Sequence, residues 1–146
     1  MSMFPHTVTL YNVEIQRGPN MTETITNRIT ILRGVFLEAS KAVNVRASGL
    51  EGADAVNLYI PFDVIAVDGE TGEEKKYVGP IAFREAPDRN GVWTMKPGET
   101  FFVKGEVVEP EMSFENISRK YDGVYRITKV DEKDFGRLKH WEVGGA

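Results

Sequence analysis

Hydrophobic and polar residues alternate with a period of two along much of the chain, which is the spacing of a β-strand with one buried face. The alternation is clear in residues 6–15, HTVTLYNVEI. Its two expected faces consist of Val8, Leu10 and Asn12 on one side and of Thr7, Thr9 and Tyr11 on the other. Similar runs follow at residues 24–39, 55–62, 77–83, 91–95, 99–107, 123–130 and 137–143.

Short segments rich in Gly, Pro, Asn and Asp separate these runs, and such residues form turns. Many short strands joined by turns are typical of all-β proteins. The pattern therefore predicts one domain over residues 1–146, built as a single small β-barrel or sandwich of short antiparallel strands with long hairpins. Pro61 and Pro80 each remove a backbone N–H donor, so we expect a sheet edge or a bend at both positions.

Residues 91–107, GVWTMKPGETFFVKGEV, are expected to form a strand, a tight turn at KPGE and a second strand. We expect Trp93 to fill the core, because one large aromatic side chain buries on the order of 150 to 250 Å². The alternative is a platform on which a ligand stacks, but exposed aromatic patches are uncommon in soluble domains.

At most one short helix is expected, in residues 113–123, SFENISRKYDG. Ser113 is suited to cap its N-terminus, Phe114 and Ile117 would share one face, and Gly123 would stop it.

Charge and composition narrow the classes of function. The chain has 18 basic and 22 acidic residues, a net charge of -4, and this balance disfavours capture of nucleic acid through its phosphates. Cysteine is absent, so no disulfide or thiolate site can form, which fits assembly in a reducing cytoplasm. No run of residues has the length of a membrane span, and the first residues lack a signal-peptide pattern. We therefore expect a soluble protein that is not exported and does not bind membranes.

The charges are unevenly distributed along the chain. Residues 17–46 hold five basic and two acidic residues, a balance of +3, whereas residues 51–74 hold seven acidic residues and no basic one, a balance of -7. Solvated loops would explain this difference. The other explanation is a self-complementary surface, and its candidate partner-binding residues are Arg28, Arg33, Glu70, Glu73 and Glu74.

A search for catalytic chemistry finds no positive signal. His6 and His140 lie near opposite ends of the sequence, outside any metal-ligand spacing, although terminal strands of a barrel could bring them together. Three carboxylate pairs resemble those of a glycoside hydrolase but lie in or beside predicted turns; they are Glu73 with Glu74, Asp131 with Asp134, and Glu106 with Glu109. Neither a nucleophile elbow nor a nucleotide-binding loop is present. We expect a protein without catalytic residues, metal or cofactor.

Five segments taken together resemble a family of small phage and prophage proteins of Gram-positive bacteria. The segments cover most of the chain; they are residues 48–62 (SGLEGADAVNLYIPF), 77–80 (YVGP), 92–106 (VWTMKPGETFFVKGE), 125–136 (YRITKVDEKDFG) and 140–145 (HWEVGG). Members of that family are similar to minor capsid or head-tail connector proteins. The resemblance implies a β-barrel subunit of the virion, assembled in the host cytoplasm. It would act in a ring of its own copies, in contact with portal, connector or tail proteins.

Three other classes of function remain open at this point. A carbohydrate-binding or host-recognition module would expose Trp93, Trp141 or Tyr59 together on one face. An oligonucleotide-binding barrel shares the short strands but needs aromatic residues interleaved with basic ones. A hydrolase would need two acids facing one cleft.

Overall fold

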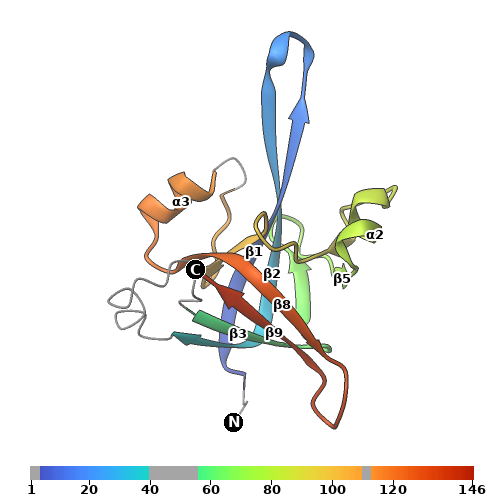
Figure 1. Ribbon diagram of the computed structural model, residues 1–146, viewed down its shortest axis with the longest axis vertical. Coiled ribbons are helices and arrows are strands. Elements are labelled where there is room, and N and C mark those ends of the chain that lie inside the picture. The colour runs from blue at the N-terminus through green and yellow to red at the C-terminus, as the bar shows by residue number, and fades with distance from the viewer. Residues whose placement is uncertain (1–3, 40–55, 110–112) are drawn as a thin grey trace.

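A computed structural model describes residues 4–39, 56–109 and 113–146 of the chain (Figure 1). Within this part, the strands are β1 (His6–Arg17), β2 (Glu23–Ala39), β3 (Val56–Pro61), β4 (Ile65–Asp68), β5 (Lys76–Tyr77), β6 (Val92–Trp93), β7 (Phe101–Lys104), β8 (Val124–Lys133) and β9 (His140–Gly145). The helices are α2 (Pro80–Glu85), α3 (Phe114–Lys120) and the 3-10 turn η1 (Pro19–Met21).

Six of the strands close into an antiparallel barrel. Their order is β1-β7-β8-β9-β3-β2, and β2 pairs with β1 to complete the circle, while β4 adds to β2 as a seventh strand. The expected all-β barrel with long hairpins is therefore confirmed. The short β5 and β6 form a separate parallel pair.

A β-bulge lets β2 serve two partners in succession. His6 lies opposite Val35 and Thr7 lies opposite Arg33, so Gly34 is the extra residue on β2. Its φ of 87° is one that glycine adopts without strain. Beyond this bulge β2 pairs with β3, from Phe36 opposite Tyr59 onward.

The barrel interior holds the main hydrophobic core. It includes Val8 and Leu10 from β1, and Trp93, which is 1% exposed as expected. A second cluster lies outside the barrel wall, where α3 covers Tyr11 and Phe101. Both faces of β1 are therefore buried near its middle, and the prediction of one wet face is wrong there because α3 covers it.

One further local prediction is confirmed and one is wrong. Residues 91–107 form β6, the turn at Lys96–Glu99 and β7, as expected, although these two strands do not pair with each other: β6 pairs with β5, whereas β7 lies between β1 and β8. Residues 77–83 do not form one bent strand, because Gly79 and Pro80 begin α2. Proline suits the first turn of a helix, where its missing N–H costs no hydrogen bond.

The predicted helix at Ser113 is confirmed. The Ser113 side chain accepts a hydrogen bond from the Asn116 backbone N–H, and Phe114 and Ile117 both pack in the second cluster. The chain leaves the helix after Lys120, before Gly123.

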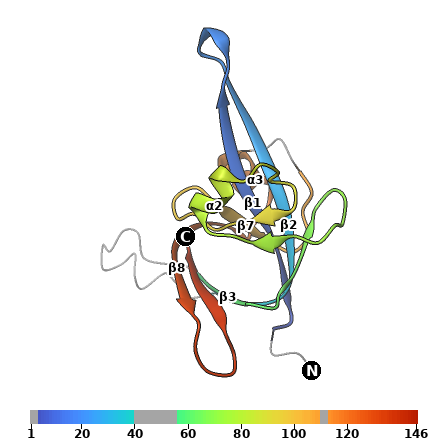
Figure 2. The same ribbon diagram turned by 90° about the vertical axis from the view of Figure 1, so that its right-hand side faces the viewer.

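Two hairpins project from opposite ends of the barrel, as both views show (Figure 1, Figure 2). One consists of the distal parts of β1 and β2, drawn in blue, and the other of β8 and β9, drawn in red. In the part of the chain that the structure describes, no helix has the length and apolar character needed to cross a membrane.

Candidate functional site: the projecting arm and its base

Residues 13–27, the end of the β1–β2 hairpin, extend beyond the barrel and are called the arm below (Figure 2). β7 pairs with β1 only from Val8 to Tyr11, and β4 pairs with β2 only from Thr30 to Arg33. Among the described residues, the strands of the arm therefore pair only with each other. Both outer edges are open, and an isolated two-stranded ribbon is marginally stable in water.

The turn at the tip of the arm has an unusual backbone. Asn20 and Met21 both have positive φ, 64° and 60°, which is the left-handed region. Asn visits this region readily, but for Met it costs about 1–2 kcal/mol. Met21 is also 97% exposed. Glycine would remove both the backbone strain and the exposed apolar surface, so the methionine side chain is costly for the folded monomer.

The arm has two different faces, because residues opposite each other in an antiparallel pair point to the same side. Val13 pairs with Asn27 on one face, and the next pair along it places Ile25 on the same side. The other face is polar: Glu14 pairs with Thr26, and Asn12 with Arg28. The Val13 face continues into the second hydrophobic cluster at the base of the arm.

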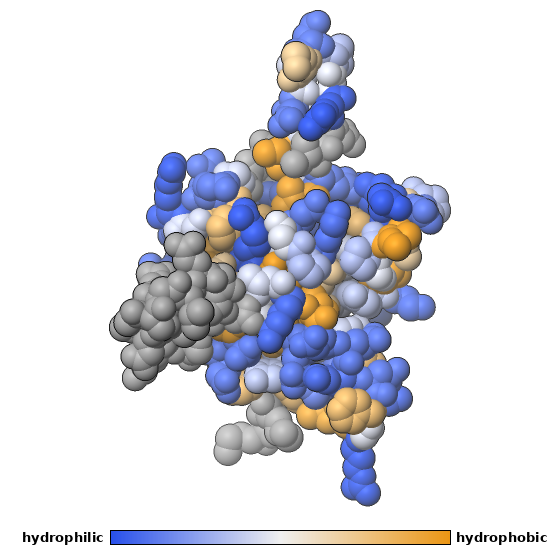
Figure 3. Space-filling view, viewed as in Figure 1, coloured by the Kyte–Doolittle hydropathy of each residue, from blue (hydrophilic) through white to orange (hydrophobic). Residues whose placement is uncertain are grey.

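A groove of about 410 Å³ opens where the Val13 face meets the barrel and α3, and it is called the arm–helix groove below. It is lined by Val13, Ile25, Asn27, Gly98, Glu99, Phe101, Ser113, Phe114, Glu115 and Arg126. Figure 3 shows apolar surface, in orange, at the base of the arm. The Arg126 guanidinium lies 4.2 Å from the centre of the Phe114 ring and 3.7 Å from the Glu115 carboxylate. The groove therefore combines an apolar floor with a rim that carries both signs of charge.

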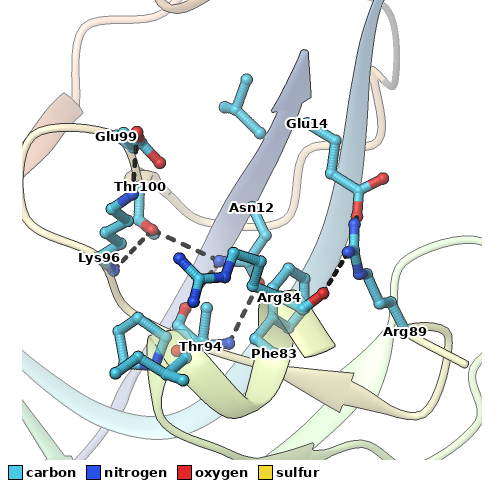
Figure 4. A pocket seen from close by; sticks show the side chains of 12 residues that line it. Asn12, Glu14, Phe83, Arg84, Arg89, Thr94, Lys96, Glu99 and Thr100 are labelled. Atoms are coloured by element: carbon cyan, nitrogen blue, oxygen red, sulfur yellow. Dashed lines mark hydrogen bonds and ion pairs between the residues drawn. The ribbon is translucent and has the colours of Figure 1, made fainter. Parts of the chain in front are cut away.

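A second groove, between β1 and α2, is polar and closely hydrogen-bonded (Figure 4). The buried Asn12 side chain donates to the Thr94 carbonyl at 2.7 Å and accepts from the Thr94 N–H at 3.2 Å. Asn12 thereby holds the segment after β6 against β1 in the way a neighbouring strand would. This arrangement explains a polar residue on the inner face of β1.

Glu14, at the other side of this groove, is held by two arginines. Arg89 donates to its carboxylate at 2.6 Å and Arg28 at 3.1 Å. Burial alone would raise the pKa of Glu14, but the hydrogen bonds and charges of Arg89 and Arg28 outweigh burial and leave the pKa below its ordinary value. Both arginines bind the same carboxylate oxygen, Oε1, and favour the ionised form, so this groove is suited to fixing the loop after α2 against the arm.

The predicted partner-binding residues lie close together in the fold: Arg28 and Arg33 are on β2, and the three acids are on the loop that follows its neighbour β4. Thr30 of β2 is opposite Asp68 of β4, so the basic and acidic segments are neighbours in one sheet. Arg28 also donates to the Asn90 side chain, and Arg33 is ion-paired with Glu106. Both arginines thus have partners within their own chain. Residues 40–46 of the basic segment and residues 51–55 of the acidic segment lie outside the described residues.

Glu70, Glu73 and Glu74 are exposed on the loop between β4 and β5. Glu70 lines one shallow groove with Arg28. Within the described part of the chain, no ion pair joins Arg28 or Arg33 to any of these three acids. Their pairing with arginines of a second copy stays a prediction.

The same loop contains a buried ion pair that sequence reasoning missed. The Lys75 side chain is 1% exposed, and its ammonium group lies 3.2 Å from the Asp68 carboxylate. The ammonium also donates to the Ile29 carbonyl and the Thr30 hydroxyl, both at 3.1 Å. Burial lowers the pKa of Lys75 below its usual range although Asp68 opposes the shift. For Asp68, burial is outweighed by hydrogen bonds from the Thr71 and Glu70 N–H groups and from Lys75, so its pKa is also lowered. The pair fastens β4 and the loop to β2.

His6 and His140 do not meet, because β1 and β9 are not neighbours in the barrel. They lie at the two ends of a row of rings that crosses four strands, with Phe36 and Tyr59 between them at centroid spacings of 5.6, 5.8 and 6.2 Å. The His6 ring also accepts a hydrogen bond from the Leu37 N–H. This contact makes His6 a bridge between β1 and β2.

Within the described part of the chain, the aromatic platform and the facing carboxylates that two of the other classes require are not brought together. Trp93 and Trp141 are buried in the barrel, where their ring centroids lie 5.9 Å apart, so they form no exposed stacking face with Tyr59. The three carboxylate pairs are exposed or half-buried on loops and strand ends. Among the described residues, no three His, Asp or Glu side chains gather as a metal site.

The model of one family, described as a family of unknown function (DUF6751), matches residues 3–146. No curated protein and no solved structure matches the chain.

Proposed function

The chain belongs to the DUF6751 family, and we propose that it is a structural subunit of a phage or prophage particle, placed at the head-tail junction. In this role it binds further copies of itself in a ring, together with portal, connector or tail proteins. The proposal rests on the sequence resemblance and on one structural observation, the projecting arm.

The arm is the feature that argues for assembly. Its open edges and its exposed Met21 contribute little to the folded monomer, and a partner that covers them would remove this cost. Open strand edges and an exposed methionine are suited to binding another protein. The barrel below it fixes the base of the arm from two sides, through the second hydrophobic cluster and through Glu14.

The resembling segments also coincide with scaffold elements. Among the described residues they include β3, β6, β7, most of β8 and β9, which carry the buried barrel residues Leu58, Trp93, Phe102, Ile127 and Val143. Because these positions are buried in the barrel, the resemblance reflects a shared fold more than a shared reactive site. A ring-forming scaffold protein is consistent with that distribution.

The test is to locate the chain in particles produced by a bacterium that carries its gene. Gold-labelled antibody against the chain should mark the head-tail junction in negative-stain electron microscopy. Deletion of the gene should leave separate filled heads and tails, and expression of the chain from a plasmid should restore whole particles. Complete particles after the deletion, or labelling elsewhere on the particle, would refute the proposal.

A further inference from the structure

We propose that the turn Pro19–Met21 at the tip of the arm seats in the arm–helix groove of a second copy of the chain. The inference rests on the proposed ring and names the contact that would hold it together. It differs from the charge pairing of Arg28 and Arg33 with Glu70, Glu73 and Glu74, since it uses neither set.

The first step concerns the tip. Met21 combines 97% exposure with a backbone conformation that disfavours methionine. Strain of this kind is often found at functional sites, and here it lies in the turn at the end of the arm, which projects from the barrel (Figure 1). A methionine side chain is unbranched and flexible, which suits insertion into an irregular apolar site.

The second step concerns the groove. Phe101 forms a buried wall, and Phe114, Val13 and Ile25 add partly exposed apolar surface around an open volume of about 410 Å³. Its floor is the open end of the second hydrophobic cluster. A side chain inserted there would extend an existing core instead of forming a new one.

The tip cannot reach the groove of its own chain. Five residue steps lead from Val13, along β1, to Gly18, a span of about 17 Å at the rise of a β-strand. The ribbon is held straight by its own ladder, with Arg17 opposite Glu23 at its end. A tip that occupies the groove must therefore come from another molecule.

Charge on the two surfaces is complementary. The tip carries Arg17 and Glu23, exposed side chains that lie 3.7 Å apart. The rim of the groove carries Glu99, Glu115 and Arg126. Arg17 can face the two acids while Glu23 faces Arg126, whereas two tips brought together have no such apolar recess. Since tip and groove are different patches, the contact is heterologous and repeats from copy to copy, as a ring requires.

Cysteine crosslinking tests the contact directly, because the natural chain contains no cysteine. The full-length Met21→Cys chain is mixed with the Glu115→Cys chain under mild oxidation, and the mixed disulfide is quantified. Two control mixtures keep one partner: Met21→Cys with Ile81→Cys on α2, and Phe135→Cys with Glu115→Cys. Ile81 and Phe135 are 65% and 70% exposed, so cysteines at these positions are also accessible to a second molecule.

The yield of the mixed disulfide between Met21→Cys and Glu115→Cys should exceed the yield of both controls by about 10-fold, because a contact that holds the two thiols together raises their effective concentration. Equal yields in all three mixtures would overturn the inference. A higher yield from Phe135→Cys would also overturn it, because the opposite hairpin would then be the occupant.

A second variant separates binding from folding. Met21→Gly relieves the positive φ at the tip, so its melting temperature should equal or exceed that of the natural chain. Its self-association, measured by sedimentation equilibrium on the full chain, should nevertheless weaken about 10-fold or more, as for the loss of one buried anchor. Unchanged association of Met21→Gly would refute the role of Met21.

The doubly substituted chain, Met21→Cys with Glu115→Cys, distinguishes the contact from the ring. A ladder of crosslinked species that ends in one closed oligomer supports both. Crosslinked dimers alone would retain the contact but would mean a twofold arrangement, and the proposed ring would then be wrong.

Discussion

The barrel and the arm are built from the same two strands but bury their side chains very differently. In the barrel, β1 is covered on both faces and paired on both edges, and Tyr11 and Leu10 have no exposed surface. A few residues further on, the same strand runs into the arm, where both outer edges are open. Leu10 and Tyr11 stabilise the fold, whereas Met21 in the arm costs the folded monomer stability, and the proposed contact with a second copy would offset that cost.

The largest effect is expected from removing Trp93 from the barrel. Its ring packs against Tyr77 and Trp141 at centroid distances of 5.0 and 5.9 Å. Trp93→Ala should lower the free energy of unfolding by about 3–5 kcal/mol, measured by urea denaturation. The matched control is Ile81→Ala at an exposed site, and equal midpoints for the two variants would contradict the assignment of Trp93 to the core.

A smaller loss is expected from Lys75→Met, which keeps the length of the side chain but removes its charge. Asp68 and the Ile29 carbonyl would each lose a hydrogen-bond donor. The expected destabilisation is about 1–3 kcal/mol. The control is its neighbour Lys76, which is exposed: Lys76→Met should change the free energy of unfolding by less than about 0.5 kcal/mol. The order of the two variants is the decisive result.

Acid should weaken the base of the arm through Glu14 and Asp68. The pKa of each carboxyl is lower in the folded chain than in the unfolded chain, so the unfolded state binds more protons as the pH falls. The stabilisation is fully present above the unfolded pKa, about 4, and is lost as the pH falls through the folded pKa. The melting temperature of Asp68→Asn should therefore fall less between neutral pH and acid than that of the natural chain. Parallel curves would show that Asp68 does not contribute to the acid sensitivity.

Replacement of the helix cap should cost about 1 kcal/mol. Ser113→Ala removes the acceptor for the Asn116 N–H, and Ser113→Asp, which keeps an acceptor, should restore the midpoint. A loss that Ser113→Asp fails to recover would point to packing of the serine rather than to capping.

The smallest effect is expected on the arm itself. Ile25→Thr keeps a β-branched side chain in β2 at a position that is 43% exposed. Its unfolding free energy should stay within about 0.5 kcal/mol of the natural value. A loss comparable to that of Trp93→Ala would show that the arm belongs to the folding core, and the contrast between the two regions would not hold.

The period-two pattern was sufficient to predict the class of fold, because each strand of the barrel must present alternate residues to its interior. The Ser113 cap was equally readable, since capping is a local interaction. Pairing partners were not readable. The turn in residues 91–107 could be predicted, but not that β7 pairs with β1 and β8 instead of with β6, because closure of the barrel decides its neighbours.

The candidate site was largely hidden for the same reason. The arm–helix groove draws its lining from five separate segments, at residues 13, 25–27, 98–101, 113–115 and 126, and no spacing in the sequence relates them. One signal was present: the alternating runs at residues 6–15 and 24–39 are longer than the five or six residues of an average strand, which is consistent with a hairpin that extends beyond a small barrel. The Gly79–Pro80 pair was likewise a local sign of α2.

Closure of the barrel also has a consequence for the rate at which the chain folds. The β1–β2 hairpin joins residues that are close in sequence, and such ribbons form within microseconds. The last seams are remote: β1 meets β7 with Val8 opposite Lys104, and β3 meets β9 with Val56 opposite Gly145. Because loop closure over such separations is slow, we expect folding in milliseconds to seconds, with an early hairpin and a late encounter of the two chain halves.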